Sequence, residues 1–245
     1  MVKLAFDPAE VTIGRKLREQ PRYSINQAAG YLSIPPTTLS SWFFGTTYGP
    51  SGNKVAFDPV LTPADSAARL LSFDNLVEAF VLRCFRKHDK IQLRMISKAI
   101  ERARFAYAID HPLLDKNLLK AGKSLFLQEA GRVFGLSDPC QLLLPNALEL
   151  FSRVEYSNDA ICALFPLTRP SAEDSPRIIS ISPDFSFGRS IINRTKVETS
   201  IVAERFLNGD SIPELASDYR CEVSEIEESI RAEWMFARGQ KNKAA

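Results

Sequence analysis

The sequence predicts a mainly helical α+β fold. Apolar residues recur at helical spacing in the first 110 residues and again in residues 170–245. Residues 111–169 instead hold short apolar runs separated by turn residues, a pattern typical of strands. The chain of 245 residues is 45% hydrophobic and 24% charged, so it can bury a substantial core. We therefore divide it into three parts: residues 1–110, a small central β-hairpin and helix region over 111–169, and a helical part over 170–245.

The stretch from Ser24 to Trp42 has the outline of two short helices joined by a tight turn. Ser24 is suited to cap the first helix. Pro35 ends that helix because proline cannot continue it, and Pro36 suits the first position of the next helix. Leu39 and Trp42 then share the inward face. This outline predicts a helix-turn-helix. An αα-hairpin with a purely structural role is the alternative.

The residues after Trp42 are rich in turn formers. Gly45, Gly49 and Gly52 predict a hairpin or loop, followed by a short alternating apolar run. A winged helix-turn-helix has its wing at this position, so we predict that fold for residues 1–110. Lys54 is the obvious charge with which such a wing would contact DNA phosphates.

Two further helices are expected, over residues 73–87 and 93–106, and basic residues outnumber acids along them. Eight basic residues and two acids stand between Arg83 and Arg104, although the whole chain carries a net charge of only +2. A basic stripe repeats every four residues: Lys90, Arg94, Lys98 and Arg102. Such a stripe beside a helix-turn-helix favours phosphate contact. A solvated helix face is the other interpretation.

The predicted DNA contacts come from the second short helix and from the basic residues after it. We expect the following to face DNA: Thr37, Thr38, Ser40, Ser41, Lys54, Lys90, Arg94 and Lys98. The helix positions are short and uncharged, so they lack an arginine–guanine contact worth roughly 1–3 kcal/mol. Affinity would then depend on the basic stripe and on a second subunit in a homodimer.

The central part is expected to hold a hairpin over 124–136, a helix over 142–151 and strands near 153–156 and 161–165. Residues 169–176 have the composition of a linker, and a short strand follows at 178–182. Neither a His/Asp/Glu cluster nor a glycine-rich phosphate loop occurs, so we expect no catalytic residue, no cofactor and no enzyme.

The last part is expected to form three helices over residues 199–207, 210–219 and 223–234, a second outline of the helix-turn-helix kind. Ten acids and three arginines lie between Glu198 and Glu233. Glu225, Glu227 and Glu228 on the last helix would be repelled by phosphates. This part therefore suggests dimerisation or protein docking rather than DNA binding.

Several other classes of protein are disfavoured. The four cysteines show no C-x-x-C spacing and only two histidines are present, so no metal site is expected. The thiols suit a reducing compartment. Because the amino-terminal residues do not resemble a signal peptide and no apolar run could span a bilayer, we expect a cytoplasmic protein without a membrane partner.

Two resemblances follow from these residues. The pattern from Ser24 to Trp42, with the phrase Leu-Ser-Phe-Asp-Asn-Leu-Val-Glu-Ala-Phe-Val-Leu-Arg at residues 71–83, resembles MerR-type winged helix-turn-helix domains. Residues 188–197 and the phrase Gly-Asp-Ser-Ile-Pro-Glu-Leu-Ala-Ser-Asp-Tyr at 209–219 are similar to a small domain of unknown function. That domain occurs in VapB-like antitoxins encoded beside PIN-like toxins. Arg194 replaces the glycine of that family's pattern, and Lys196 its arginine.

Together the resemblances imply a VapB-like antitoxin of a toxin-antitoxin module. Such a protein binds operator DNA as a dimer, represses its own operon and neutralises a PIN-like ribonuclease toxin. A PIN-type nuclease site is acidic, so basic side chains near the C-terminal part are the expected toxin contacts: Arg189, Arg194, Lys196 and Arg238. Two alternatives stay open: a ligand-sensing MerR-like transcriptional regulator without a toxin partner, whose effector site would lie in the central sheet, and a scaffold that binds no DNA.

Overall fold

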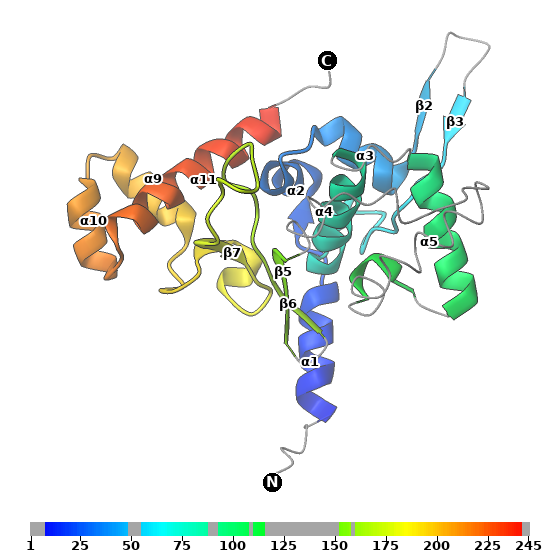
Figure 1. Ribbon diagram of the computed structural model, residues 1–245, viewed down its shortest axis with the longest axis horizontal. Coiled ribbons are helices and arrows are strands. Elements are labelled where there is room, and N and C mark those ends of the chain that lie inside the picture. Colours follow the sequence, from blue (N-terminus) through cyan, green and yellow to red (C-terminus); the bar gives the residue numbers. More distant parts are fainter. Residues whose placement is uncertain are drawn as a thin grey trace.

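The computed structural model describes residues 8–48, 55–87, 93–107, 110–115, 152–157 and 160–241, and it is a mainly helical α+β fold, as predicted (Figure 1). The helices are α1 (Pro8–Glu19), α2 (Ile25–Leu32), α3 (Pro36–Phe44), α4 (Phe73–Lys87), α5 (Leu93–Tyr107), α9 (Thr199–Leu207), α10 (Ile212–Tyr219) and α11 (Val223–Lys241). The strands are β1 (Tyr23–Ser24), β2 (Thr46–Tyr48), β3 (Val55–Phe57), β4 (Leu70–Leu71), β5 (Val154–Ser157), β6 (Ala160–Leu164), β7 (Ile179–Ile181) and β8 (Ser190–Ile192). The predicted hairpin at 124–136 and helix at 142–151 lie outside the described residues.

Helices α2 and α3 form as their sequence predicts. The hydroxyl of Ser24 accepts a hydrogen bond from the backbone N–H of Gln27 at 3.2 Å, which caps α2. Ser33 ends the helix in the left-handed conformation with φ of 50°, and its N–H bonds to the carbonyl of Gly30. After this turn α3 begins at Pro36 and buries Leu39 and its neighbour on the same face, Trp42.

The predicted hairpin after α3 is present as the antiparallel pair β2–β3. Gly45 turns the chain into it with φ of +68°, and a Cβ there would lie 2.6 Å from the carbonyl oxygen of Phe57. Only glycine fits this position. Behind the hairpin, Val60 and Leu61 both donate backbone N–H groups to the carbonyl of Trp42, which fixes the returning chain against α3.

Three elements of the N-terminal half are additions to the predicted outline. Helix α1 is twelve residues long and has Lys16 and Arg18 in its last turn. Strands β1 and β4 form a two-residue ladder in which Tyr23 pairs with Leu71. Helix α4, by contrast, has the predicted bounds, and it is buried at every position from Phe73 to Phe85, so it occupies the centre of this half.

Strands β5–β8 form one antiparallel sheet in chain order. Strand β8 was not predicted; it pairs with β7 through Ile179 opposite Ile192. The segment predicted as a linker is an ordered loop instead. The buried side chain of Arg153 donates to the backbone carbonyls of Ala172 and Ser175, with the first bond 2.7 Å long. These bonds attach the loop to the sheet.

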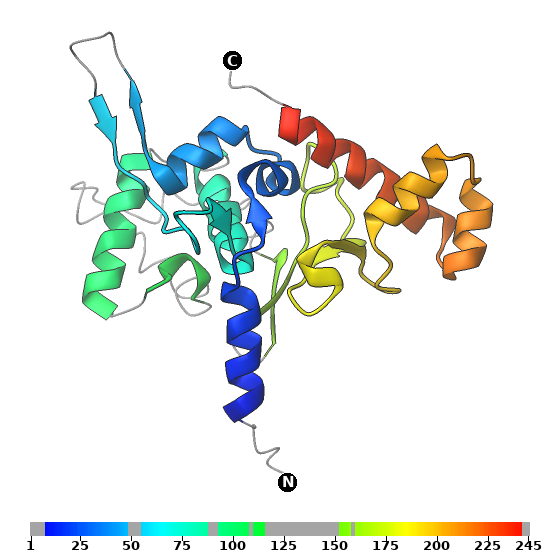
Figure 2. The ribbon, with the colours of Figure 1, turned by 180° about the vertical axis from the view of Figure 1, so that it is seen from behind.

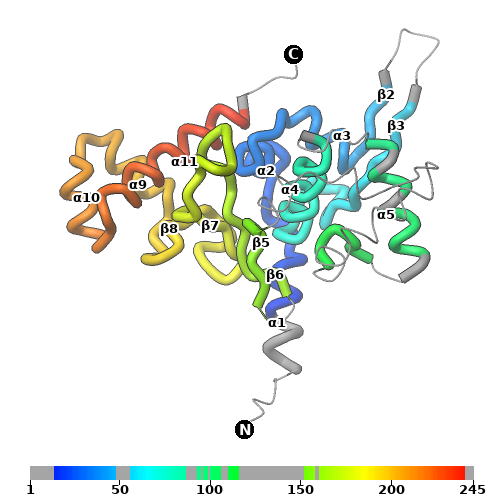
Figure 3. The backbone as a smooth tube through the Cα atoms, in the orientation of Figure 1, coloured from blue at the N-terminus to red at the C-terminus, as the bar shows by residue number. Residues whose placement is uncertain are grey.

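Helix α11 runs from α9 and α10 at one end of the molecule to α2 near its middle (Figures 2 and 3). Its first turns pack on α9 and α10, and its last turns pack on α2. The rings of Tyr31 and Phe236 meet edge to face with centroids 4.9 Å apart. The hydroxyl of Tyr23 donates to the carbonyl of Gly188 at 2.8 Å. The first and last parts of the chain therefore share one hydrophobic core.

Candidate nucleic-acid interface and partner surface

The predicted DNA-contacting side of α3 lies at the surface. Thr37 is exposed, and Thr38, Ser40 and Ser41 are partly exposed. A shallow groove of about 380 Å³ runs along three of these four residues, between α3, the start of α2 and the start of β2. Its lining residues are Ile25, Asn26, Pro36, Thr37, Ser40, Ser41, Gly45 and Thr46. Thr38 does not line it.

The hydroxyl groups on this helix differ in what they can offer a ligand. Ser41 donates to the backbone carbonyl of Thr38 at 2.7 Å, so its proton is used within α3. Ser40 accepts a hydrogen bond of 2.8 Å from the guanidinium of Arg69. Thr37, at the first turn and exposed, has no such internal bond among the described residues.

Arg69 is a candidate contact that the sequence reasoning missed. It lies in the loop before β4 with φ of 54°, and its guanidinium carbon stands 3.9 Å from the ring centroid of Phe44. Asp65 holds the loop by accepting the N–H of Ala68 at 2.8 Å and by two backbone bonds to Leu70. The side chain of Arg69 is therefore positioned beside α3, although nothing local in the sequence relates it to Ser40.

The basic residues of α5 are exposed: Arg94, Lys98 and Arg102 all reach the surface. Helix α5 lies at the same end of the long axis as the β2–β3 hairpin (Figure 1). Lys54 and Lys90 lie outside the described residues. Arg83 belongs to the same run of basic residues in the sequence, but it is buried and does not extend this surface.

The basic residues predicted to contact a toxin are mostly engaged within the chain. Arg189 forms an ion pair of 2.9 Å with Glu198. Arg194 makes a two-pronged pair with Glu225, of 2.5 and 3.1 Å, which raises the pKa of the arginine and lowers that of the carboxyl. In both pairs the arginine is exposed, whereas the carboxylate is largely buried.

Lys196 and Arg238, the other two predicted toxin contacts, belong to different elements: Lys196 lies between β8 and α9, and Arg238 lies in α11. Lys196 adopts φ of 62° and its ammonium stands 4.6 Å from the ring centroid of Phe185. Arg238 is exposed on the last turns of α11. The structure therefore does not gather the four cations into one patch around a single pocket.

The acids of α11 are arranged differently from the expectation. Glu225 and Glu228 are buried and ion-paired, and only Glu227 is exposed. Glu228 accepts from Arg169 at 2.6 Å and from the hydroxyl of Thr168. The prediction assumed that all three carboxylates face the solvent and repel phosphate. This assumption is wrong for Glu225 and Glu228, which are buried and paired with arginines.

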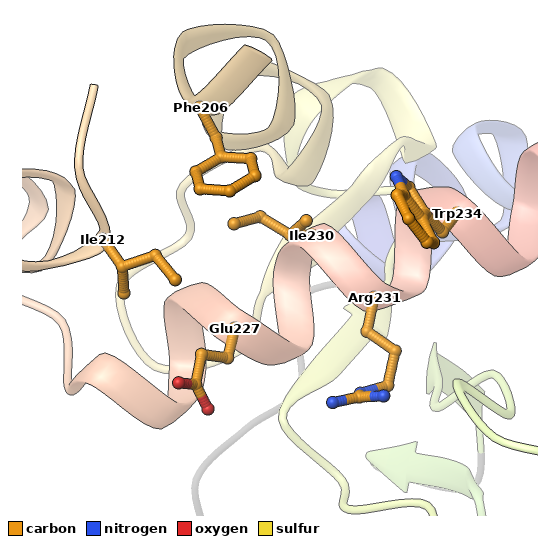
Figure 4. A pocket seen from close by; sticks show the side chains of 6 residues that line it. All are labelled: Phe206, Ile212, Glu227, Ile230, Arg231 and Trp234. Carbon is orange, nitrogen blue, oxygen red and sulfur yellow. The ribbon is translucent and has the colours of Figure 1, made fainter. Parts of the chain in front are cut away.

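An apolar groove of about 420 Å³ opens between α9, α10 and α11 (Figure 4). Phe206, Ile212 and Ile230 form its walls, with Trp234 at one end, and Glu227 and Arg231 are the charged residues that line it. The side chain of Trp234 is 71% exposed, an unusual state for a large aromatic residue. This groove is a candidate surface for a protein partner.

A more polar cavity of about 350 Å³ lies where α2 meets β8, α9 and α11. It is lined by Gln27, Tyr31, Arg189, Ser190, Glu198, Ser200, Glu233, Phe236 and Gln240. Glu233 accepts hydrogen bonds there from the hydroxyls of Ser190 and Thr199. Burial raises the pKa of Tyr31, so its phenol stays a neutral donor.

No cluster of three metal-binding side chains occurs in the described part of the chain. His111 pairs instead with the buried Glu78 at 3.0 Å. Within the same described residues, no helix is long and apolar enough to cross a membrane. Cys84, Cys162 and Cys221 form no disulfide there.

One family match covers part of the chain. Residues 179–231 match the family described as "Protein of unknown function (DUF433)". The match runs from β7 to the middle of α11 and includes the apolar groove as far as Arg231. The half of α11 that packs on α2 lies beyond it.

Two longer similarities reach across most of the chain, both with proteins of Mycobacterium tuberculosis. The uncharacterized protein Rv2308 of strain ATCC 25618 / H37Rv is 22% identical over 205 residues, which is 81% of this chain and 84% of that protein. The crystal structure of Rv2018 superposes with a TM-score of 0.65 at 16% identity, covering 86% of this chain and 98% of that one. At this identity the second similarity shows a shared fold.

Proposed function

We propose that this protein is a DNA-binding antitoxin of a toxin-antitoxin module. In this proposal α2, α3 and the β2–β3 hairpin act as a winged helix-turn-helix, with α3 in the major groove of operator DNA. A homodimer would place two such units on two half-sites and repress the protein's own operon. No catalytic residue is assigned.

The observation that carries the DNA-binding proposal is the arrangement of side chains around α3. Leu39 and Trp42 hold the helix to the core, which leaves Ser40 at the surface, where it accepts a hydrogen bond from the guanidinium of Arg69. The uncharged helix thereby gains one cation from a neighbouring loop. Helix α5, at the same end of the molecule as the β2–β3 hairpin, carries further exposed basic residues, among them Arg94. Arginine can contact either a phosphate or a guanine edge.

The toxin-binding part of the proposal rests on the resemblance of the C-terminal part to VapB-like antitoxins. The apolar groove of α9–α11 supports it, because an exposed tryptophan in a groove is the type of anchor that protein interfaces use. We assign the groove to a PIN-like toxin. Arg231 lines the groove, and Arg238 is exposed further along α11.

A gel shift assay tests the DNA-binding part. The full chain should retard a DNA fragment carrying the region upstream of its own gene. Replacing both Arg94 and Lys98 with glutamate should weaken binding and lower the slope of log affinity against log salt by about two. A wild-type chain that fails to bind this fragment would overturn the proposal.

Co-purification with the product of the adjacent reading frame tests the toxin part. Trp234→Ala should weaken capture of that protein at least about tenfold, since interface tryptophans often contribute 2 kcal/mol or more. Phe105→Ser is the matched control, because Phe105 is 94% exposed on a different helix. If Trp234→Ala instead converts a dimer into a monomer without changing capture, a second copy occupies the groove.

A ligand-sensing regulator is the second candidate, and the polar cavity between α2 and α11 is the observation that favours it. The cavity touches the first helix of the proposed reading unit, so an occupant would contact both halves of the molecule. Its location differs from the central sheet where the sequence suggested an effector site. An adjacent gene that encodes no toxin would favour this candidate.

A further inference from the structure

Arg83, near the C-terminal end of α4, is a buried cation for which the described residues provide no counter-charge. Only 8% of the residue is exposed. Within the described part of the chain, its guanidinium makes no ion pair and no hydrogen bond, whereas the other strongly buried charges, such as Glu78 and Glu228, have partners. Burial lowers the pKa of Arg83 below its usual range. An unpaired buried charge lowers the stability of the folded state. Its presence is explained if a bound anion supplies the missing counter-charge.

Arg83 is one of the residues that line a small pocket at the turn between α2 and α3. The pocket has a volume of about 260 Å³ and is lined by Ser33, Ile34, Pro35, Trp42, Arg83 and Arg86. The hydroxyl oxygen of Ser33 is buried and has no hydrogen-bond partner among the described residues. Arg86 is exposed at the same pocket. Ser33 and two arginines thus border one pocket, and no carboxylate-bearing residue lines it within the described part of the chain.

This set of donors selects an oxyanion. Guanidinium groups present paired N–H donors that match the oxygens of phosphate, and a serine hydroxyl adds a third donor. The apolar walls formed by Ile34, Pro35 and Trp42 lower the local dielectric constant, which strengthens each charged contact. The volume is below that of sites for drug-sized ligands, so one anionic group fits better than a large molecule.

We infer that this turn pocket binds a phosphate group, and that the sugar–phosphate backbone of bound DNA supplies it. The source of the phosphate rests on the proposed DNA-binding function, whereas the pocket itself does not. Pro35 lines the pocket and immediately precedes α3, so a phosphate held there would lie beside the first turn of the proposed reading helix. Such a contact would fix the orientation of the helix without reading sequence.

The test begins with inorganic phosphate and the full chain. Phosphate should raise the melting temperature above that in chloride at equal ionic strength, because a ligand that binds only the native state stabilises it. Arg83→Met keeps the apolar stem and removes the charge. It should abolish this increase while leaving the melting temperature in chloride unchanged or higher, since an unpaired buried cation has been removed.

Ser33→Gly is the second variant, because glycine accepts the left-handed conformation of this residue while removing the hydroxyl. It should fold and show a smaller phosphate effect. Arg177→Gln is the control, since it removes one positive charge from an exposed residue outside the pocket. It should retain the full effect.

The DNA arm separates the two possible sources of phosphate. Arg83→Met should lower affinity for the upstream fragment about five- to twentyfold and reduce the salt slope by about one. If Arg83→Met loses the phosphate effect but leaves the salt slope unchanged, the pocket serves a free phosphate or a phosphorylated small molecule and the assignment to DNA is overturned.

Two further outcomes separate the pocket from the proposed function. If the wild type binds no DNA yet responds to phosphate, the proposed function fails and the pocket stands. If phosphate has no effect on the wild type, or Arg83→Met lowers the melting temperature in chloride and keeps the phosphate effect, the pocket is not a phosphate site.

Discussion

Gly30 of α2 lies in direct backbone contact with Gly239 of α11. A Cβ added to Gly239 would stand 3.0 Å from the Cα of Gly30, and one added to Gly30 would stand 2.7 Å from the carbonyl oxygen of Phe236. The two helices therefore approach more closely than any side chain allows. This contact joins the proposed reading unit to the C-terminal unit.

Gly30→Ala should destabilise the protein by about 1–3 kcal/mol, because the backbone of α11 must shift to admit the methyl group. Gly14→Ala is the matched control. Gly14 is also on a helix, but a Cβ there has nothing within 4 Å, so the change should be neutral or stabilising through helix propensity. Urea unfolding of both variants measures the difference. Equal stability of the two would show that the helices separate without cost.

Glu228→Ala should lower the free energy of unfolding by about 2–3 kcal/mol, because it removes the buried carboxylate that accepts hydrogen bonds from Arg169 and from the hydroxyl of Thr168. The value is discounted for the partial exposure of Arg169. Glu227→Ala, one residue earlier and exposed, should change stability by less than about 0.5 kcal/mol. Chemical unfolding of the pair provides the comparison, and similar losses would contradict a clamping role for Glu228.

The pair of His111 and Glu78 predicts a dependence of stability on pH. The hydrogen bond from His111 to Glu78 raises the pKa of the histidine above its usual 6.5, against the opposing effect of burial. Asp74 adds to the increase and Arg104 opposes it. The resulting stabilisation is complete below the unfolded-state pKa and is lost as pH rises through the folded-state value.

The midpoint of urea unfolding, measured at intervals between about pH 5.5 and about pH 8.5, should therefore decrease across the upper part of this pH range. His111→Gln should flatten that fall, because glutamine has no proton to lose. His88→Gln is the control, since it removes the other histidine of the chain and should leave the fall in place. An unchanged profile in His111→Gln would mean that other groups cause the dependence.

Arg69→Gln should lower affinity for the upstream DNA fragment about tenfold and reduce the salt slope by about one. The reason is the position of its guanidinium, which contacts Ser40 on α3 and stacks on Phe44. Arg15→Gln removes an equal charge from the exposed face of α1 and should have little effect. Fluorescence anisotropy at several salt concentrations distinguishes the two variants. Equal behaviour would place Arg69 outside the interface.

Local signals in the sequence were sufficient for most helices. Ser24 and Pro36 define the limits of α2 and α3 by capping and by proline geometry, which depend only on near neighbours. Strands β1 and β4 were missed because a two-residue ladder between Tyr23 and Leu71 depends on contacts distant in sequence. Strand β8 was missed for the same reason.

The predicted site was incomplete because charge was counted along the sequence rather than in space. Arg83 counted as a surface charge, yet α4 is buried on all sides and Arg83 with it. Arg69 was overlooked because its contact with Ser40 spans 29 residues. Glu225 and Glu228 counted as repelling acids, although buried carboxylates tend to be paired. Whether α3 contacts DNA stays a prediction.

The glycine contact between α2 and α11 also has a consequence for biosynthesis. Gly239 leaves the ribosome about 200 residues after Gly30, roughly 10–40 seconds later at ordinary rates of translation. During that interval the face of α2 that carries Tyr31 has no covering helix. A nascent chain would thus expose this face to chaperones until α11 emerges, and premature termination before Phe236 would leave it exposed permanently.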